Sequence, residues 1–164
     1  MVPDRLMTGE DTSGYDLTRF KVAQHQPVGG QATALAEIRS GGKRSHWIWY
    51  VLPQHRELGQ SDIALYYGIS CLGEAVAYLG DEELEANLIE VCEAILDSPT
   101  DDPVTVMGGH TDAMKLRSSM TLFELAAVSL GTPGSVFSKV LDRMFGGQRD
   151  GLTLAIVGDE RVEF

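Results

Sequence analysis

The chain has 164 residues, 43% of them hydrophobic and 23% charged, which suits one globular domain that needs no disulfide or structural metal to fold. The formal net charge of −11 argues against nucleic acid or an anionic membrane as a partner, because an acidic surface repels phosphate groups. No apolar run approaches the roughly 20 residues that cross a bilayer, and the first residues lack the apolar core of a secretory signal, so we expect a cytoplasmic protein.

The first residues of the chain are predicted to form a flexible tail. Residues 1–14 are polar and contain Pro and Gly. Asp16 then stands where an N-cap would open a helix over 17–26. The PVGG sequence ends that helix, and a second helix is predicted over 31–40, before GGKRS. The folded domain is accordingly expected over 15–164.

The middle of the chain continues with short helices. Ser45 is placed to cap a third helix over 46–52, although a strand is the alternative because Trp, Ile, Tyr and Val favour sheets. Asp81 opens a long helix over 82–98, whose apolar residues form one stripe. Further helices are predicted over 62–69, 71–80, 111–130 and 136–145.

The end of the chain leaves one choice open. The LTLAIVG sequence at 152–158 is either a short terminal helix or the one plausible strand. The whole pattern predicts a single all-α or nearly all-α domain of seven to nine short helices, with at most one minor strand pair. Cys71 and Cys92 lie in apolar helical segments and have no CxxC partner, so we expect free thiols.

The charges are unevenly distributed. Residues 57–114 contain thirteen Asp or Glu and no Lys or Arg. The basic residues gather on either side of this stretch, at Lys43 and Arg44 and again at Lys115 and Arg117. Each cation could simply pair with a local carboxylate, but two tight clusters among polar and aromatic residues favour an anion-binding site.

The first cluster lies in the sequence KRSHWIWYVLPQH at 43–55. A helix capped at Ser45 would aim free N–H groups at an anion, and the dipole would keep His46 neutral and able to accept a proton. Trp47 and Trp49 are candidates to stack on a base, with core packing as the alternative. The ligand-binding residues predicted here are Lys43, Arg44, Ser45, Trp47, Trp49 and Gln54, and His46 is a predicted catalytic residue.

The second cluster lies in the sequence KLRSSMTLF at 115–123. Hydroxyls beside Lys and Arg are the donors that hold phosphates or carboxylates. Small Ser residues that let another helix approach closely are the alternative. The ligand-binding residues predicted here are Lys115, Arg117, Ser118, Ser119 and Thr121, and Asp112 is the second predicted catalytic residue. No metal is predicted, because His25 and His110 show no ligand spacing, and His55 is expected at the surface.

Five stretches resemble, in order, the blocks of a bacterial family: YDLTRFKVAQ, ALAEIRSGGKRSHWIWYVLPQ, LGQSDIALYYGI, EAVAYL and DAMKLRSSMTLFE. The family is known as the domain of unknown function numbered 1810, and the resemblance covers roughly residues 15–157. This chain has Tyr-Val-Leu at 50–52 where the family more often has Phe-Ile-Phe, a conservative departure. The resemblance implies a mostly helical fold and a bacterial cytoplasmic protein, and supplies no established reaction. The label calpastatin, sometimes given to the family, denotes a disordered inhibitor and does not suit a compact helical chain.

The mixture of Trp, Lys and an acidic residue is similar in layout to small helical proteins that process ADP-ribose or other N-glycosides. The function expected is therefore binding of a small anionic, nucleotide-like ligand such as ADP-ribose or an NAD-related N-glycoside. In a hydrolytic version of that function, a carboxylate stabilises the oxocarbenium ion that forms as the bond breaks. The alternative is a non-catalytic protein-interaction or structural helical module. No cofactor is expected, and the oligomeric state is left open.

Overall fold

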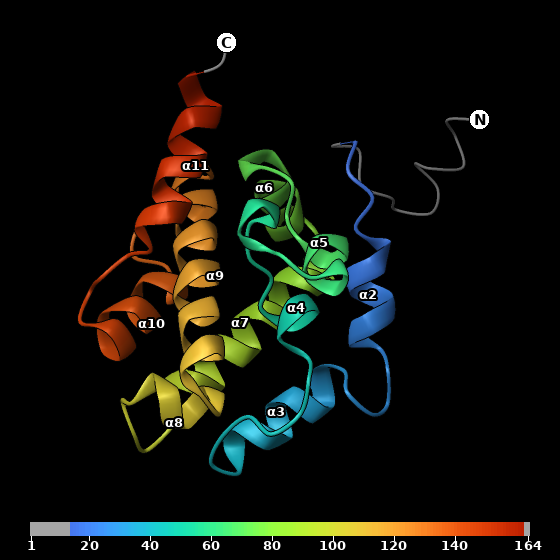
Figure 1. The fold of residues 1–164 in the computed structure, drawn as a ribbon, viewed down its shortest axis with the longest axis vertical. Coiled ribbons are helices and arrows are strands. Elements are labelled where there is room, and N and C mark those ends of the chain that lie inside the picture. Colours follow the sequence, from blue (N-terminus) through green and yellow to red (C-terminus); the bar gives the residue numbers. More distant parts are fainter. Residues whose placement is uncertain (1–13, 163–164) are drawn as a thin grey trace.

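The computed structural model describes the backbone of residues 14–162 and side chains as far as Glu160, so most of the predicted tail at 1–14 lies outside the described residues. The described part is built from helices (Figure 1). They are α2 (Thr18–Gln24), α3 (Gln31–Arg39), α4 (Ile48–Val51), the 3-10 turn η1 (Arg56–Leu58), α5 (Asp62–Tyr67), α6 (Leu72–Gly80), α7 (Glu82–Leu96), α8 (Pro103–Met107), α9 (His110–Ser129), α10 (Val136–Phe145) and α11 (Gly151–Val162). The predicted all-α fold is confirmed.

One detail of the prediction needs adjustment, and one choice that the sequence left open is decided. Residues 103–107 form α8, one helix more than expected, because Asp102 caps it by accepting from the Val104 N–H at 3.0 Å and proline stands in its first turn. The terminal apolar segment forms the helix α11 and no strand. Among the described residues there is no sheet, and the one isolated bridge pairs His55 with Ile69.

The long helix α7 forms as its sequence pattern indicates. The Asp81 side chain accepts a hydrogen bond from the Leu84 N–H at 3.0 Å, which satisfies one of the free donors of the first turn. The apolar stripe is buried and comprises Leu84, Leu88, Val91, Cys92 and Ile95. These side chains pack α7 against α3, α6 and α10, so local capping and burial act together.

The helix α9 lies at the centre of the fold. It packs against α6, α8, α10 and α11, and Figure 1 shows α10 and α11 along one side of it with α2 on the far side of the molecule. A row of aromatic rings crosses the core, with centroids 5.1 Å apart between Phe20 and Tyr78, 5.1 Å between Tyr78 and Phe123, and 5.8 Å between Phe123 and Phe137. This row ties α2, α6, α9 and α10 together. In the described part of the chain, no helix has both the length and the apolarity needed to cross a membrane.

Candidate functional site

The loop that carries the first basic cluster lies directly against the loop that leads into α9. The Lys43 N–H donates to the Val106 carbonyl at 2.8 Å, so the backbone of this loop is bonded to α8 just before the loop that leads into α9. Gly108 has a φ of +77°, and a Cβ atom there would lie 2.3 Å from the Lys43 carbonyl oxygen. Only glycine permits both the conformation and the approach. The glycine therefore brings Lys43 to the first turn of α9.

Two lysines lie beside the carboxylate of Asp112, and each of them also lies over a tryptophan ring. Lys43 Nζ lies 2.7 Å from one carboxylate oxygen, and Lys115 Nζ lies 3.9 Å from the other. Lys43 Nζ also lies 5.2 Å from the ring centroid of Trp47, and Lys115 Nζ 5.4 Å from that of Trp49. Both distances are within the range of cation–π attraction. We call these five residues the Asp112 site, and it unites the two predicted clusters.

The Asp112 site has a buried half and an accessible half. The Lys43 side chain is 6% exposed and Trp47 is fully buried, so they belong to the core. The side chains of Lys115 and Asp112 are 26% and 24% exposed. A dissolved ligand can therefore contact Lys115 and one edge of Asp112, whereas the charge of Lys43 is compensated inside the protein.

The accessible aromatic ring of the site belongs to Trp49, which is half-buried against the core. The imidazole of His46 stacks on it with ring centroids 6.2 Å apart, and His46 is exposed. The indole N–H of Trp49 is buried and has no acceptor among the described residues. A planar ligand that stacks at Trp49 would therefore lie within reach of an imidazole and an ammonium group.

The predicted anion cradle at Ser45 is wrong, because a carboxylate of the protein fills it. Glu37 accepts hydrogen bonds from the Arg44 N–H at 2.7 Å, the Ser45 N–H at 3.0 Å, the Ser45 hydroxyl at 2.5 Å and the Trp47 indole at 2.9 Å. Ser45 does not cap the next helix, which is only four residues long and begins after Trp47. The donors expected to bind a ligand instead fix the loop at 44–47.

These contacts control the ionisation of Glu37. Burial alone would raise the pKa of this carboxyl group, but the bonds from the Ser45 hydroxyl, the Arg44 N–H and the Trp47 indole outweigh burial and lower the pKa to about 2. Glu37 is therefore ionised at every physiological pH. It supplies a permanent negative charge behind the loop that carries His46.

The hydroxyl groups predicted on α9 are buried and belong to helix packing. Ser118 donates to the Met114 carbonyl at 3.2 Å, and Thr121 to the Arg117 carbonyl at 2.8 Å. Thr121 also accepts from the backbone N–H of residue 150 at 2.9 Å. Ser119 is fully buried, and its hydroxyl has no partner among the described residues. The alternative interpretation, in which small hydroxyl residues let a neighbouring helix approach closely, explains these residues better than a solvent-facing row of hydrogen-bond donors.

The remaining predicted residues lie apart from one another. Arg117 faces Asp150 at 3.8 Å, near the beginning of α11. The Gln54 carbonyl accepts from the Ile69 N–H at 2.9 Å, and its side chain has no hydrogen bond with the described residues. The Arg44 side chain is exposed and has no carboxylate partner in the described part of the chain. Arg44 is thus an unpaired cation next in sequence to Lys43.

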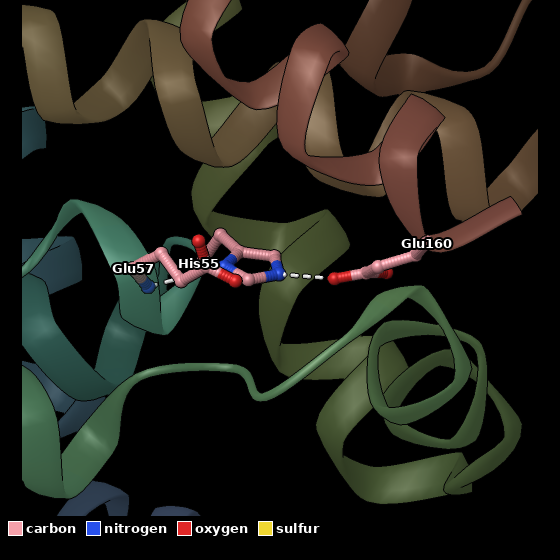
Figure 2. Close-up of side chains that lie close together, drawn as sticks. All are labelled: His55, Glu57 and Glu160. Carbon is pink, nitrogen blue, oxygen red and sulfur yellow. Dashed lines mark hydrogen bonds and ion pairs between the residues drawn. The ribbon is translucent and has the colours of Figure 1, made fainter. Parts of the chain in front are cut away.

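His55, expected at the surface, is fully buried. Its Nε2 atom lies 2.6 Å from one carboxylate oxygen of Glu160, and the other oxygen accepts from the Leu72 N–H at 2.9 Å (Figure 2). Glu160 in α11 therefore caps α6 and holds the segment before η1 at the same time. The sequence gives no local sign of this contact, because the two partners are 105 positions apart.

His55 and Glu160, together with Glu57, are also the metal-ligand candidates of the described part of the chain. Ligand atoms of these three residues lie within 4.8 Å of one another. The Glu57 N–H donates to His55 Nδ1 at 3.1 Å (Figure 2). This bond requires Nδ1 to be an acceptor, so the ring proton is on Nε2 and points at Glu160. A metal on Nε2 would move the proton to Nδ1, against the Glu57 donor. The geometry favours a hydrogen-bonded clamp, and the absence of a metal stays a prediction.

Tyr66 borders two surface hollows, and Arg19 also lines both of them. One has a volume of about 370 Å³ and is bordered by Val22 and Tyr67, and the other of about 400 Å³ is bordered by Arg56 and Ser70. Tyr66 itself is 61% exposed. None of the predicted ligand-binding residues lines either hollow.

Comparisons with known proteins support the family and the fold. The family described as "Protein of unknown function (DUF1810)" matches residues 14–157. The crystal structure of the conserved hypothetical protein Rv1873 from Mycobacterium tuberculosis is similar, with a TM-score of 0.78 and 38% sequence identity, over 88% of this chain and 97% of that chain. A search of curated proteins finds no match. These names state no activity, so a function has to be argued from the site itself.

Proposed function

The chain belongs to the DUF1810 family, and we propose that it binds a small anionic, nucleotide-like ligand at the accessible half of the Asp112 site. The observation that supports this proposal most is the position of the Lys115 ammonium over the Trp49 ring, 5.4 Å from its centroid. Lys115 is accessible, with its side chain 26% exposed, and Trp49 is half-buried. Together these groups offer both a stacking surface and a charge for an anion.

Each accessible group has a definite part in this proposal. Trp49 stacks on the base or ring of the ligand, which such rings do at a gain of about 1–3 kcal/mol. Lys115 pairs with an anionic group, and His46 donates or accepts one hydrogen bond beside it. The unpaired side chain of Arg44 adds positive charge on the same loop. ADP-ribose and NAD-related N-glycosides combine a base with esterified phosphates and fit this description.

Binding is better supported than hydrolysis of the N-glycosidic bond. A carboxylate that stabilises an oxocarbenium ion has to face the sugar, whereas both oxygens of Asp112 lie beside lysine ammonium groups, at 2.7 and 3.9 Å. His46 remains available for proton transfer, since no carboxylate or carbonyl of the described residues is bonded to its ring. The hydrolytic form of the proposal therefore depends on His46 and is tested by product formation.

The test is isothermal titration of the full chain with ADP-ribose and with NAD, alongside thermal unfolding. Ligand at 100 times its Kd adds about 2.7 kcal/mol to the free energy of unfolding, a rise in Tm of roughly 5–10 °C for this chain length. Lys115→Met should weaken binding by about 1.5–3 kcal/mol, as for a lost charge-assisted hydrogen bond, and Trp49→Ala should weaken it similarly. Lys139→Met, an exposed lysine on α10, is the matched control. Equal affinity of Lys115→Met and wild type for every ligand would overturn the proposal.

A second candidate function, protein interaction, is favoured by the surface around Tyr66. The exposed tyrosine borders two hollows, and Val22 and Leu65 beside it are 62% and 38% exposed. Exposed aromatic residues with neighbouring arginines are typical of interaction hot spots. A partner bound here should be lost in Tyr66→Ala and retained in Trp49→Ala, as measured by affinity purification with each variant.

A further inference from the structure

We propose that Asp112 selects the charge of the ligand and that the Asp112 site admits singly charged groups, such as a phosphodiester, and disfavours a doubly charged terminal phosphate. This inference rests on the proposed function and concerns the same site. It assigns Asp112 a specificity-determining role, in place of the catalytic role that the sequence suggested. It follows from the way in which the positive charges of the site are already used.

The first step is the charge of Lys43. Its ammonium lies 2.7 Å from Asp112 and over the buried ring of Trp47, and its side chain is 6% exposed. A ligand cannot reach this ammonium group, and its positive charge is neutralised by the Asp112 carboxylate. Lys115 is therefore the one ammonium group of the Asp112 site that a ligand can reach.

The second step is the position of Lys115. Its ammonium is accessible and lies 3.9 Å from the second oxygen of Asp112, which is itself 24% exposed. An anion that pairs with Lys115 therefore also lies near the Asp112 carboxylate. Attraction to the lysine offsets one negative charge on the ligand, whereas a second charge on the same phosphorus meets no second accessible lysine in the Asp112 site and is repelled by Asp112.

The long contact between Lys115 and Asp112 makes this arrangement open to exchange. A charge-assisted bond has a usual length near 2.8 Å, which Lys43 achieves and Lys115 does not. An incoming anion can thus replace Asp112 as the partner of Lys115, while Asp112 stays with Lys43. Asp112 acts as an internal competitor whose charge the ligand has to match or outweigh.

The matched probes are ADP and its terminal methyl ester. They share the base, the ribose and both phosphorus atoms, and the ester lacks the second negative charge that a terminal phosphate acquires above pKa ≈ 6. At pH 7.5 the wild-type chain should bind the ester about threefold to tenfold more tightly than ADP, as expected for one extra charge several ångströms from a carboxylate in partly screened surroundings. This comparison needs no variant and therefore no assumption about folding.

The second measurement uses Asp112→Asn, with Asp101→Asn as a control for net charge, since Asp101 is exposed and has no partner among the described residues. Asp112→Asn should strengthen ADP binding and reduce the preference for the ester to within about twofold. Asp101→Asn should bind the ester more tightly than ADP by the same factor as the wild-type chain. Thermal unfolding reports whether Asp112→Asn remains folded.

The outcomes separate the two proposals. If ADP-ribose, ADP and the ester all fail to bind, the proposed function is wrong and this inference is lost with it. If ADP-ribose binds, but the ester binds no more tightly than ADP to the wild-type chain, the proposed function stands and the charge-selecting role of Asp112 is overturned. Loss of ADP-ribose hydrolysis in Asp112→Asn with unchanged affinities would likewise refute this role and support proton transfer.

Discussion

Glu37 is predicted to hold the loop of the Asp112 site in place, and replacement by glutamine is the most direct perturbation. The side chain accepts four hydrogen bonds, two of them from the backbone N–H groups of Arg44 and Ser45. Glutamine keeps the shape, loses the charge, and turns an NH₂ group toward donors that need an acceptor. The substitution therefore tests the carboxylate and leaves the packing nearly unchanged.

The expected magnitude follows from the pKa of Glu37, which falls from 4.5 to about 2. Each tenfold change in an ionisation constant corresponds to 1.36 kcal/mol, so the carboxylate could contribute up to about 3 kcal/mol to the free energy of unfolding. Glu37 is only half-buried, and solvent screening reduces this contribution to about 1–2 kcal/mol. For a chain of this length, Glu37→Gln should lower Tm by roughly 2–8 °C at pH 7.

The pH dependence of Tm distinguishes the carboxylate from a general packing effect. Because the folded pKa is lowered, the stabilisation is fully present above about 4.5 and disappears as the pH falls toward about 2. The difference in Tm between wild type and Glu37→Gln should therefore be largest at pH 7 and less than half as large at pH 3. Differential scanning calorimetry at the two pH values measures it directly.

The control for this experiment is Glu93→Gln, which removes an exposed carboxylate of α7 that has no partner among the described residues. It should change Tm by less than about 1–2 °C at either pH. A Glu37→Gln variant as stable as wild type at pH 7 would refute the reasoning. A stability difference of the same size at pH 3 and pH 7 would show that the loss comes from packing and not from the charge.

Three further perturbations have defined outcomes. His55→Gln and Glu160→Gln each break the clamp of Figure 2 and should each cost about 1–3 kcal/mol in denaturant unfolding, and the double variant should cost clearly less than the sum, because both act on one bond. Burial raises the pKa of the Cys92 thiol, so Ellman's reagent should modify only the half-buried Cys71 in the native chain and both thiols after unfolding; rapid native modification of two thiols would contradict this. Gly108→Ala places a side chain at a positive-φ position against a facing backbone carbonyl and should lower Tm by several degrees. An unchanged Tm would show that the contact between Gly108 and the Lys43 carbonyl is not as close as described.

The parts of the fold that the sequence predicts well are those determined within a few residues. Asp81 caps its helix as predicted, and Ser61 caps α5 in the same way, because each side chain accepts from an N–H three positions along. The stripe of α7 is buried as predicted, because helical periodicity leaves one apolar face. Fold class and most helix positions follow from such local patterns, which need no knowledge of the rest of the chain.

The Ser45 cap was predicted wrongly because a distant group decides the local structure. The residues around Ser45 carry a capping residue before an apolar run, which is a good local signal. Glu37, eight positions earlier, binds the same donors with a full charge and shortens the helix to Ile48–Val51. A neutral cap of about 1 kcal/mol cannot compete with several charge-assisted bonds. The GGKRS turn between them gives no sign of that choice.

The hydroxyl groups of α9 show a different limit. A helix enclosed on most sides by its neighbours has no clearly exposed face. Helical periodicity therefore cannot show whether its hydroxyl groups face a ligand or pack against another helix. Ser118 and Thr121 are buried because α9 lies at the centre of the fold, and their hydroxyls bond to carbonyls of their own helix. That central position depends on α6, α8, α10 and α11 together and cannot be predicted from the α9 sequence alone.

Lys43 from the first basic cluster and Lys115 from the second converge on Asp112, and the physical basis of this convergence lies in how one carboxylate is shared. A buried lysine needs a carboxylate partner, since an unpaired ammonium in the core costs several kcal/mol, and Asp112 meets that need for Lys43. Once Asp112 is held there, its second oxygen lies beside Lys115 without a short bond. The structural pair thus creates a loosely bound cation at the surface next to Trp49. Under the charge-selecting role that we propose for Asp112, the residue that pairs with the buried lysine also limits which anions Lys115 can accept, so core stability and ligand choice both depend on this side chain.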